Sequence, residues 1–130
     1  MTLHIVPGYA AALALFYVLL SIGVIRNRRH YKVSLGVGGA GELERSMRAH
    51  GNFAEYAPFT LLLLAMAELQ GSPAAALHLL SLCLVAGRLF HAWGLSRPAD
   101  VNRFRTVGMA LTFAAMTGGA VLVLLESLAA

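Results

Sequence analysis

Charged residues and cysteine are both scarce in this sequence. Only 12% of its 130 residues are charged and 58% are hydrophobic, whereas a typical soluble domain carries about 25% charged residues. The single cysteine, Cys83, excludes an intramolecular disulfide, and its apolar surroundings make it a poor nucleophile. The C-x-x-C and H-x-x-x-H spacings of common metal sites are also missing, so we expect no bound metal.

Alternation of polar and apolar residues, the pattern of a membrane β-barrel, is missing as well. The sequence instead contains four long apolar segments, each near the ~20 residues that cross a ~30 Å hydrocarbon core as a helix. We predict spans at Tyr9–Ile25, Glu44–Leu69, Ala74–Leu95 and Val107–Leu125. These spans take up most of residues 1–130, so the predicted fold is a single all-α integral membrane domain, a bundle of four transmembrane helices.

The net charge of +4 is distributed unevenly over the connections between these spans. Basic residues follow the first span and separate the third from the fourth: Arg26, Arg28, Arg29, Lys32, Arg97, Arg103 and Arg105. By the positive-inside rule, both basic loops face the cytoplasm and both termini lie outside. Because these cations flank spans, they do not indicate nucleic-acid binding. No basic residue precedes the first span, so we expect a retained span and not a cleaved signal peptide.

The second span begins with a polar stripe, which is unusual at membrane depth. At about 100° per residue, five polar side chains fall within one sector of roughly 100°: Glu44, Arg45, Arg48, Asn52 and Glu55. An ionisable residue near the centre of a spanning helix costs ~2.5–3.5 kcal/mol on insertion scales. We therefore predict that this face binds a ligand. The alternative is that Arg48 and Glu55 pair with each other and only hold helices together.

Two further features lie on the third and fourth spans. Arg88 and His91 stand at i and i+3, so they share one helix face. The alternative for Arg88 is that its side chain reaches outward to the lipid headgroups. Ala110, Ala114 and Gly118 repeat every four residues and predict a close helix-packing face.

Polar side chains gather at the basic end of the predicted bundle, where we expect one cavity lined by Arg26, Arg48, Asn52, Glu55, Arg88, His91 and Arg105. Such a cavity is strongly positive and has a single carboxylate. It suits a ligand with two or more carboxylates and one amine, because arginine binds carboxylate in a bidentate fork and glutamate pairs with ammonium. Glutathione has this charge pattern, but other acidic metabolites and lipid headgroups fit it as well.

Three sequence blocks carry a family resemblance. They are E-R-x-x-R-A-H-x-N-x-x-E-Y-x-P at Glu44–Pro58, GRLFHAWG at Gly87–Gly94 and N-R-F-R-T-V-G at Asn102–Gly108. Together with the four spans, they make the chain similar to the MAPEG family, the membrane-associated proteins in eicosanoid and glutathione metabolism. The resemblance implies a homotrimer that binds glutathione between subunits near the cytoplasmic face. The loop-poor composition resembles that of a bacterial inner-membrane member.

The resemblance also implies roles for individual residues of the first two spans. Arg48, Asn52 and Glu55 match the family's glutathione-binding stripe, with Tyr56 beside them as a further cofactor contact. Arg26, at the end of the first span, resembles an arginine that a neighbouring subunit contributes to the site.

The third and fourth spans supply the remaining implied contacts. His91 stands where the family has a histidine or tyrosine that contacts the cofactor, and we expect Arg88 to contact it from the same face. Arg105 resembles the catalytic arginine that stabilises the glutathione thiolate, with Thr106 next to it at the cofactor, where some members have serine. A guanidinium beside the sulfur lowers the thiol pKa from ~8.5 and favours the thiolate at pH 7.

The implied function is that of a glutathione transferase or glutathione peroxidase. The thiolate would attack a hydrophobic electrophile or a lipid hydroperoxide held in the membrane lipid. Two alternatives stay open: a non-catalytic glutathione- or lipid-binding protein of the same fold, and a structural or transport role. Leu95 and Met109 stand where well-studied members have tyrosines, and Gly51 replaces a polar residue of some members, so the substrate stays open too.

Overall fold

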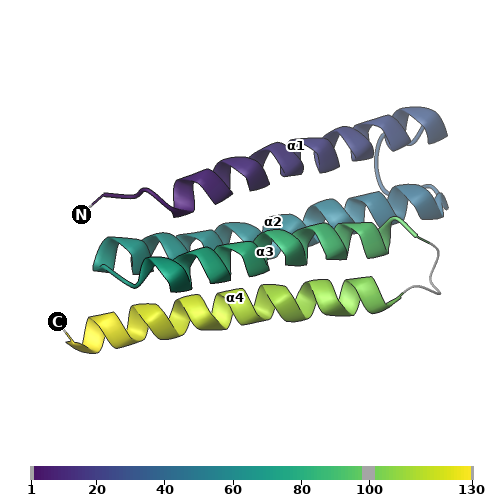
Figure 1. Cartoon of the computed structure of the whole chain (residues 1–130). Coiled ribbons are helices and arrows are strands. Elements are labelled where there is room, and N and C mark those ends of the chain that lie inside the picture. The colour runs from purple at the N-terminus through teal and green to yellow at the C-terminus, as the bar shows by residue number, and fades with distance from the viewer. Residues whose placement is uncertain (1, 98–101, 130) are drawn as a thin grey trace.

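The computed structural model of the chain describes residues 2–97 and 102–129. The described residues form four helices, α1 (Val6–Tyr31), α2 (Gly41–Gln70), α3 (Ala74–Leu95) and α4 (Asn102–Ala129). Consecutive helices run in opposite directions, so both termini lie at one end of the bundle, and the end of α3 and the start of α4 lie at the other, with the α1–α2 connection (Figure 1). The predicted all-α bundle is confirmed, and the described residues include no strand.

Three helices of the described chain, α1, α3 and α4, are long and apolar enough to cross a membrane by length and composition. α2 is longer, with 30 residues, but less apolar, because its first half carries the polar stripe. It contacts α1, α3 and α4, and so lies within the same bundle of helices. Side chains such as Leu15, Leu79 and Leu124 are exposed on the outside of the bundle, as expected for a surface that faces lipid.

The helix boundaries agree best with the sequence prediction at α3, which begins and ends at the predicted residues. α1 continues beyond Ile25 to Tyr31, because basic side chains suit a helix end that reaches the headgroup layer. It ends at Lys32, whose φ of 55° lets its backbone N–H bond the carbonyls of Arg28 and Arg29. α2 and α4 also start before the predicted spans.

α3 and α4 make the most extensive helix–helix contact of the described bundle, because glycine stands where their backbones meet. A Cβ atom placed on Gly108 would lie only 2.5 Å from the backbone nitrogen of His91 and 2.6 Å from the carbonyl oxygen of Gly87. One placed on Gly94 would lie 2.7 Å from the backbone nitrogen of Arg105. Real Cβ atoms essentially never approach other atoms within 3.0 Å, so this contact, the glycine seam, requires glycine.

The small-residue face predicted on the fourth span lies only partly in this contact. Gly118 does approach α3, because a Cβ atom there would lie 2.5 Å from the side chain of Leu80. Ala110 and Ala114 are exposed in the described chain, whereas α4 buries Gly108, Thr112 and Ala115. Close packing of these two alanines against another helix stays a prediction.

α1 is attached differently, through Leu13, which is buried in the core with Phe53 and Ala57 of α2, and through polar contacts with α2. Near the N-terminus, the carboxylate of Glu68 accepts three backbone hydrogen bonds. The donors are the N–H groups of His4 and Ile5, at 2.6 Å each, and of Val6, at 2.9 Å. The first N–H groups of a helix have no partner within the helix, so this carboxylate caps α1.

The His50 ring joins the middle of α1 to α2. Its Nε2 atom lies 3.0 Å from the hydroxyl oxygen of Ser21, and the ring stacks on Tyr17 with 4.6 Å between centroids. Tyr17 in turn stacks on Phe53 at 5.0 Å. These contacts hold α1 with few buried side chains of its own.

Candidate functional site

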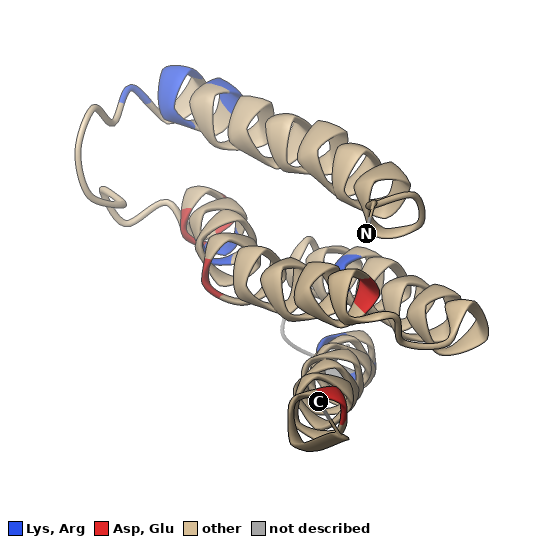
Figure 2. Cartoon of the chain, turned by 90° about the vertical axis from the view of Figure 1, so that its left-hand side faces the viewer, with Lys and Arg blue, Asp and Glu red and all other residues tan. Residues whose placement is uncertain are grey.

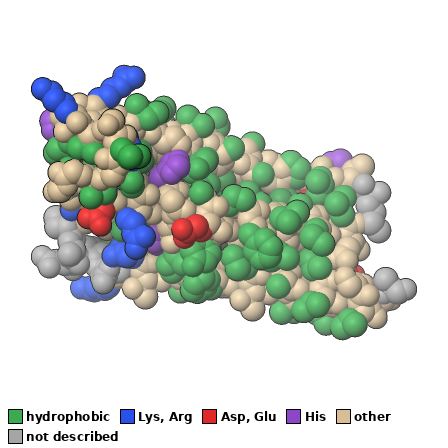
Figure 3. All heavy atoms as spheres, turned by 180° about the vertical axis from the view of Figure 1, so that it is seen from behind, with side chains coloured by type: hydrophobic (Ala, Val, Ile, Leu, Met, Phe, Trp, Pro, Cys, Tyr) green, Lys and Arg blue, Asp and Glu red, His purple; other side chains and the backbone are tan. Residues whose placement is uncertain are grey.

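Most Lys and Arg residues lie toward the end of the bundle away from the termini (Figure 2). Figure 3 shows arginine, glutamate and histidine side chains close together at this end. A cavity of about 210 Å³ opens here between α2, α3 and α4. We call it the polar cavity, and it is lined by Met47, Arg48, Gly51, Asn52, Glu55, His91, Leu95 and Arg105.

The polar cavity brings together five of the predicted site residues: Arg48, Asn52, Glu55, His91 and Arg105. The first three share one face of α2, because they stand at i, i+4 and i+7. His91 comes from α3 and Arg105 from α4. The glycine seam places these two helices against each other at this level, so both side chains reach the same cavity.

The charges in the polar cavity favour an anion. Two guanidinium groups, of Arg48 and Arg105, face one carboxylate, of Glu55. Arg48 and Glu55 are both exposed, so a ligand can reach them. Within the described residues, no three His, Cys, Asp or Glu side chains are grouped to hold a metal ion. The arrangement therefore suits a ligand with carboxylates for the guanidinium groups and an ammonium for the carboxylate.

The polar cavity is small. Ligand pockets for drug-sized molecules have volumes of ~300–1,000 Å³, and this cavity holds about 210 Å³.

A second and wider space, of about 460 Å³, adjoins the polar cavity and shares His91 and Arg105 with it. We call it the apolar hollow, because its other walls are largely apolar: Thr106, Met109, Ala110 and Phe113 of α4. Arg105 lines both spaces, so one residue borders a polar and an apolar compartment.

Arg88 and Tyr56 lie behind the polar cavity and do not line it. The Arg88 side chain is only 2% exposed, so it does not reach outward to the headgroups. Its guanidinium donates to Asn52 Oδ1 at 2.6 Å and to Thr112 Oγ1 at 2.7 Å. The Tyr56 ring centroid lies 5.9 Å from the guanidinium carbon of Arg88. Within the described chain, these two side chains support residues of the wall.

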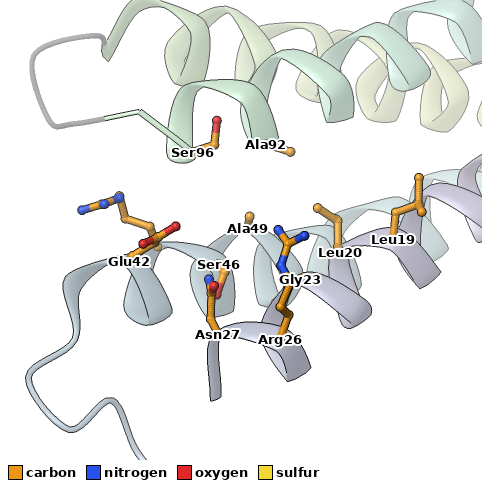
Figure 4. Close-up of a pocket in the computed structure, with 11 residues that line it drawn as sticks. Leu19, Leu20, Gly23, Arg26, Asn27, Glu42, Ser46, Ala49, Ala92 and Ser96 are labelled. Carbon is orange, nitrogen blue, oxygen red and sulfur yellow. The ribbon is translucent and has the colours of Figure 1, made fainter. Parts of the chain in front are cut away.

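Arg26 lies at a separate cavity of about 200 Å³, between α1, α2 and α3. Its side chain points from α1 toward Ala92 on α3, with Ser46 and Ala49 of α2 on the same side (Figure 4). Within one chain, Arg26 therefore does not join Arg48 at the polar cavity. Its contribution to the site of a neighbouring subunit stays a prediction.

Two residues at the site were not predicted from the sequence. Met47 lines the polar cavity, and Thr112 is the main acceptor for Arg88 on α4. A signal for Thr112 does exist, since a buried guanidinium needs acceptors and a hydroxyl within an apolar span can supply one. No comparable signal marks Met47.

The positions that depart from the family pattern also lie at the site. Leu95 and Gly51 line the polar cavity, and a Cβ atom at Gly51 would have nothing within 4 Å, so the missing side chain leaves space. Met109 lines the apolar hollow, and its sulfur accepts a hydrogen bond from Arg88 at 3.3 Å.

Fold and site together define a membrane-embedded four-helix bundle with a positively charged cavity at its basic end. Residues 6–125 match the MAPEG family, which is nearly the whole chain. The protein belongs to the MAPEG family, as its sequence blocks predicted.

Two relatives come from strains of one species. Inner membrane protein YecN of Escherichia coli K12 is 36% identical over 108 residues, which is 83% of this chain and 81% of the relative. YecN of Escherichia coli O6:H1 strain CFT073 matches with the same figures. Their name places these relatives in the inner membrane.

Proposed function

We propose that the protein is a glutathione-dependent transferase or peroxidase of the bacterial inner membrane, acting on hydrophobic electrophiles or lipid hydroperoxides. One observation carries the proposal: charged and polar side chains from α2, α3 and α4 converge on a single positively charged cavity. Family membership and the inner-membrane relatives support it. The positive-inside rule would place this basic end in the cytoplasm, where glutathione is available.

Each wall group has a defined task in binding. Arg48 holds a glutathione carboxylate as a bidentate fork, and Glu55 pairs with the ammonium group. Asn52 and His91 bind the peptide portion between these charges. Thr106, which lines the apolar hollow, is the further cofactor contact that we predict, whereas Arg88 and Tyr56 serve the site from behind the cavity by supporting Asn52.

The chemistry centres on Arg105, because this residue borders both spaces. With glutathione in the polar cavity, a sulfur near Arg105 is held as thiolate. The thiolate attacks an electrophilic carbon in the apolar hollow, a carbon–sulfur bond forms, and the leaving group departs with its electron pair. With a lipid hydroperoxide, the sulfur takes one oxygen and the lipid alcohol leaves. A second glutathione then forms the disulfide and releases water.

We further propose a homotrimer, in which a neighbouring subunit completes the small polar cavity and contributes Arg26. The small volume of the cavity and the exposed apolar side chains support this assembly. Native mass spectrometry of the protein released from mild detergent should show mainly trimer, and monomer alone would count against shared sites.

Arg48→Ala tests the binding half of the proposal. The substitution removes a charge-assisted contact, which typically contributes about 1.5–3 kcal/mol, so glutathione affinity should fall roughly tenfold or more. Calorimetric titration of glutathione into the purified protein measures this. Arg29→Ala is the matched control, because Arg29 is an exposed arginine of α1 outside the polar cavity. Equal affinities for both variants would mean that the stripe does not bind glutathione.

Arg105→Ala tests the chemical half. Total glutathione affinity should fall modestly, whereas turnover of a chlorinated nitrobenzene should collapse at pH 7, because the thiolate loses its stabilising charge. The lost rate should partly return as pH rises toward the ordinary thiol pKa of ~8.5, where hydroxide supplies thiolate without help. Rate–pH profiles of both proteins, with the ultraviolet absorbance of bound thiolate, measure this. An unchanged thiolate titration with a lost rate would assign Arg105 to substrate positioning.

A non-catalytic glutathione- or lipid-binding protein is the second candidate. The apolar Leu95 in the wall of the polar cavity favours it, since well-studied members carry tyrosine there. Tight glutathione binding by the wild-type protein, with neither thiolate nor turnover at any pH, would support this candidate over the enzyme.

A further inference from the structure

Arg88 carries a full positive charge inside the bundle without a neutralising carboxylate among the described residues. Its guanidinium instead forms hydrogen bonds with neutral groups. Nη1 donates to Asn52 Oδ1 at 2.6 Å, and Nε and Nη2 donate to Thr112 Oγ1 at 3.0 and 2.7 Å. Nη2 also lies 3.3 Å from the sulfur of Met109. A buried charge of this kind is tolerated only while its acceptors stay in place.

Thr112 accepts two of these bonds because the glycine seam holds it against α3. Its hydroxyl donates to the carbonyl oxygen of Gly108 at 2.8 Å, which leaves the oxygen lone pairs for Arg88. A Cβ atom on Gly87 would lie 2.8 Å from the same hydroxyl oxygen. Thr112 is 0% exposed, so its only role in the described chain is toward the interior.

The bond from Arg88 also determines which way the Asn52 amide points. A guanidinium has donors only, so the amide atom that faces it must be the oxygen. With Oδ1 engaged by Arg88, the NH₂ group of Asn52 is the part available to the polar cavity that Asn52 lines. Asn52 therefore offers a hydrogen-bond donor to a ligand, as do Arg48 and Arg105, the two arginines that line the same cavity.

We infer that Thr112 is a positioning residue, which acts through Arg88 to fix the Asn52 amide as a donor to a carboxylate or carbonyl oxygen of the ligand. The inference rests on the proposed function for the identity of that ligand, glutathione. It adds a residue that touches neither the cavity nor the reacting atoms.

Two substitutions at Thr112 test the role of its hydroxyl. Thr112→Val keeps the shape and removes the acceptor, so Arg88 and then Asn52 lose their fixed positions, and glutathione affinity should fall about fivefold. Thr112→Ser keeps the acceptor and should bind within about twofold of the wild type. Calorimetric titration with glutathione in detergent, on protein whose assembly and thermal midpoint are recorded, measures both.

A double-mutant cycle with Asn52→Asp separates positioning from general stability. The aspartate still accepts from Arg88 but has no N–H to donate, so the variant should stay folded and bind glutathione about tenfold more weakly. If Thr112 acts through Asn52, Thr112→Val should cause little further loss of affinity in this background, because the contact it positions is already gone. This loss of effect is not expected of a residue that merely stabilises the fold.

The outcomes distinguish the inference from the proposed function. Wild-type protein without measurable glutathione binding would overturn both. Wild-type binding with an unchanged affinity in Thr112→Val, or with the same fivefold loss in the Asn52→Asp background, would overturn the positioning role alone. A Thr112→Val protein that does not fold leaves the test to Asn52→Asp, and undiminished glutathione binding by that variant would overturn the donor role of Asn52.

Discussion

Two pairs of helices in this bundle are held together by different kinds of contact. α3 and α4 meet at the glycine seam, whereas α1 is attached to α2 through side chains. At the seam, backbones touch directly through Gly87, Gly94 and Gly108, with no room for a Cβ atom. α1 is attached by a carboxylate cap at Glu68, by the ring of His50 and by Leu13, which is buried in the core with Phe53 and Ala57 of α2. The polar cavity is built on the close-packed part and takes none of its lining residues from α1.

The outer face of α1 is apolar and exposed. Leu15 is 71% exposed and Leu19 is 63% exposed, on a helix that does not contact α4 in the described chain. An apolar surface of this kind is stable in lipid or against another subunit. The comparison therefore separates the close-packed α3–α4 contact, on which the candidate site is built, from a helix with an apolar face open to contacts outside the chain.

The largest effect on stability and on glutathione binding should follow from Gly108→Ala, which disrupts the packing at the glycine seam. The added methyl group meets backbone atoms of His91 and Gly87, and backbone cannot move aside as a flexible side chain can. Overpacking of this kind costs about 1–3 kcal/mol or more, and separation of α3 from α4 should also remove glutathione binding. Thermal denaturation in detergent and calorimetric titration measure the two effects.

Gly8→Ala on α1 is the matched control for that substitution. A Cβ atom there would have nothing within 4 Å, and alanine is favoured over glycine inside a helix by roughly 0.5–1 kcal/mol. The variant should therefore be as stable as the wild type or slightly more stable. Comparable destabilisation by both substitutions would remove the distinction between the seam and α1.

A smaller effect should follow from Glu68→Ala, which removes the cap of α1. Hydrogen bonds to a charged group contribute about 1.5–3 kcal/mol, and partial exposure of this carboxylate places the expected loss at the lower end of that range. The loss of the cap should appear as faster hydrogen exchange at the backbone amides of residues 4–6. Glu68→Gln should give exchange rates between those of the wild type and Glu68→Ala, because an amide oxygen still accepts hydrogen bonds. Glutathione affinity should stay within about twofold, and a larger loss would show that the site depends on α1.

Much of this fold could be predicted from the sequence, because the patterns that indicate helices and helix faces involve residues close together in the chain. Long apolar runs predicted the helices, and α3 was predicted at its observed bounds. The polar stripe was predicted from helical spacing, and Arg48, Asn52 and Glu55 do share one cavity wall. Residues on one helix face stay together whatever the rest of the chain does.

The parts that were missed depend on how helices approach one another. Two faces of α4 carry small residues, and the sequence analysis named Ala110, Ala114 and Gly118 but not Gly108, which makes the tightest contact with the α3 backbone. The acceptor of Arg88 was missed for the same reason, since Thr112 lies 24 positions further along the chain and meets Arg88 only across the seam. Spacing within one helix does not determine the rotation of that helix against its neighbour.

The cap at Glu68 has a consequence for how the chain enters the membrane. The N–H groups at the start of α1 bond to a carboxylate 62 to 64 positions later in the sequence. While only α1 has been made, those donors depend on water at the membrane surface, because the partner that satisfies them does not yet exist. The α1–α2 hairpin is thus the shortest product of synthesis in which the first helix has its full set of hydrogen bonds.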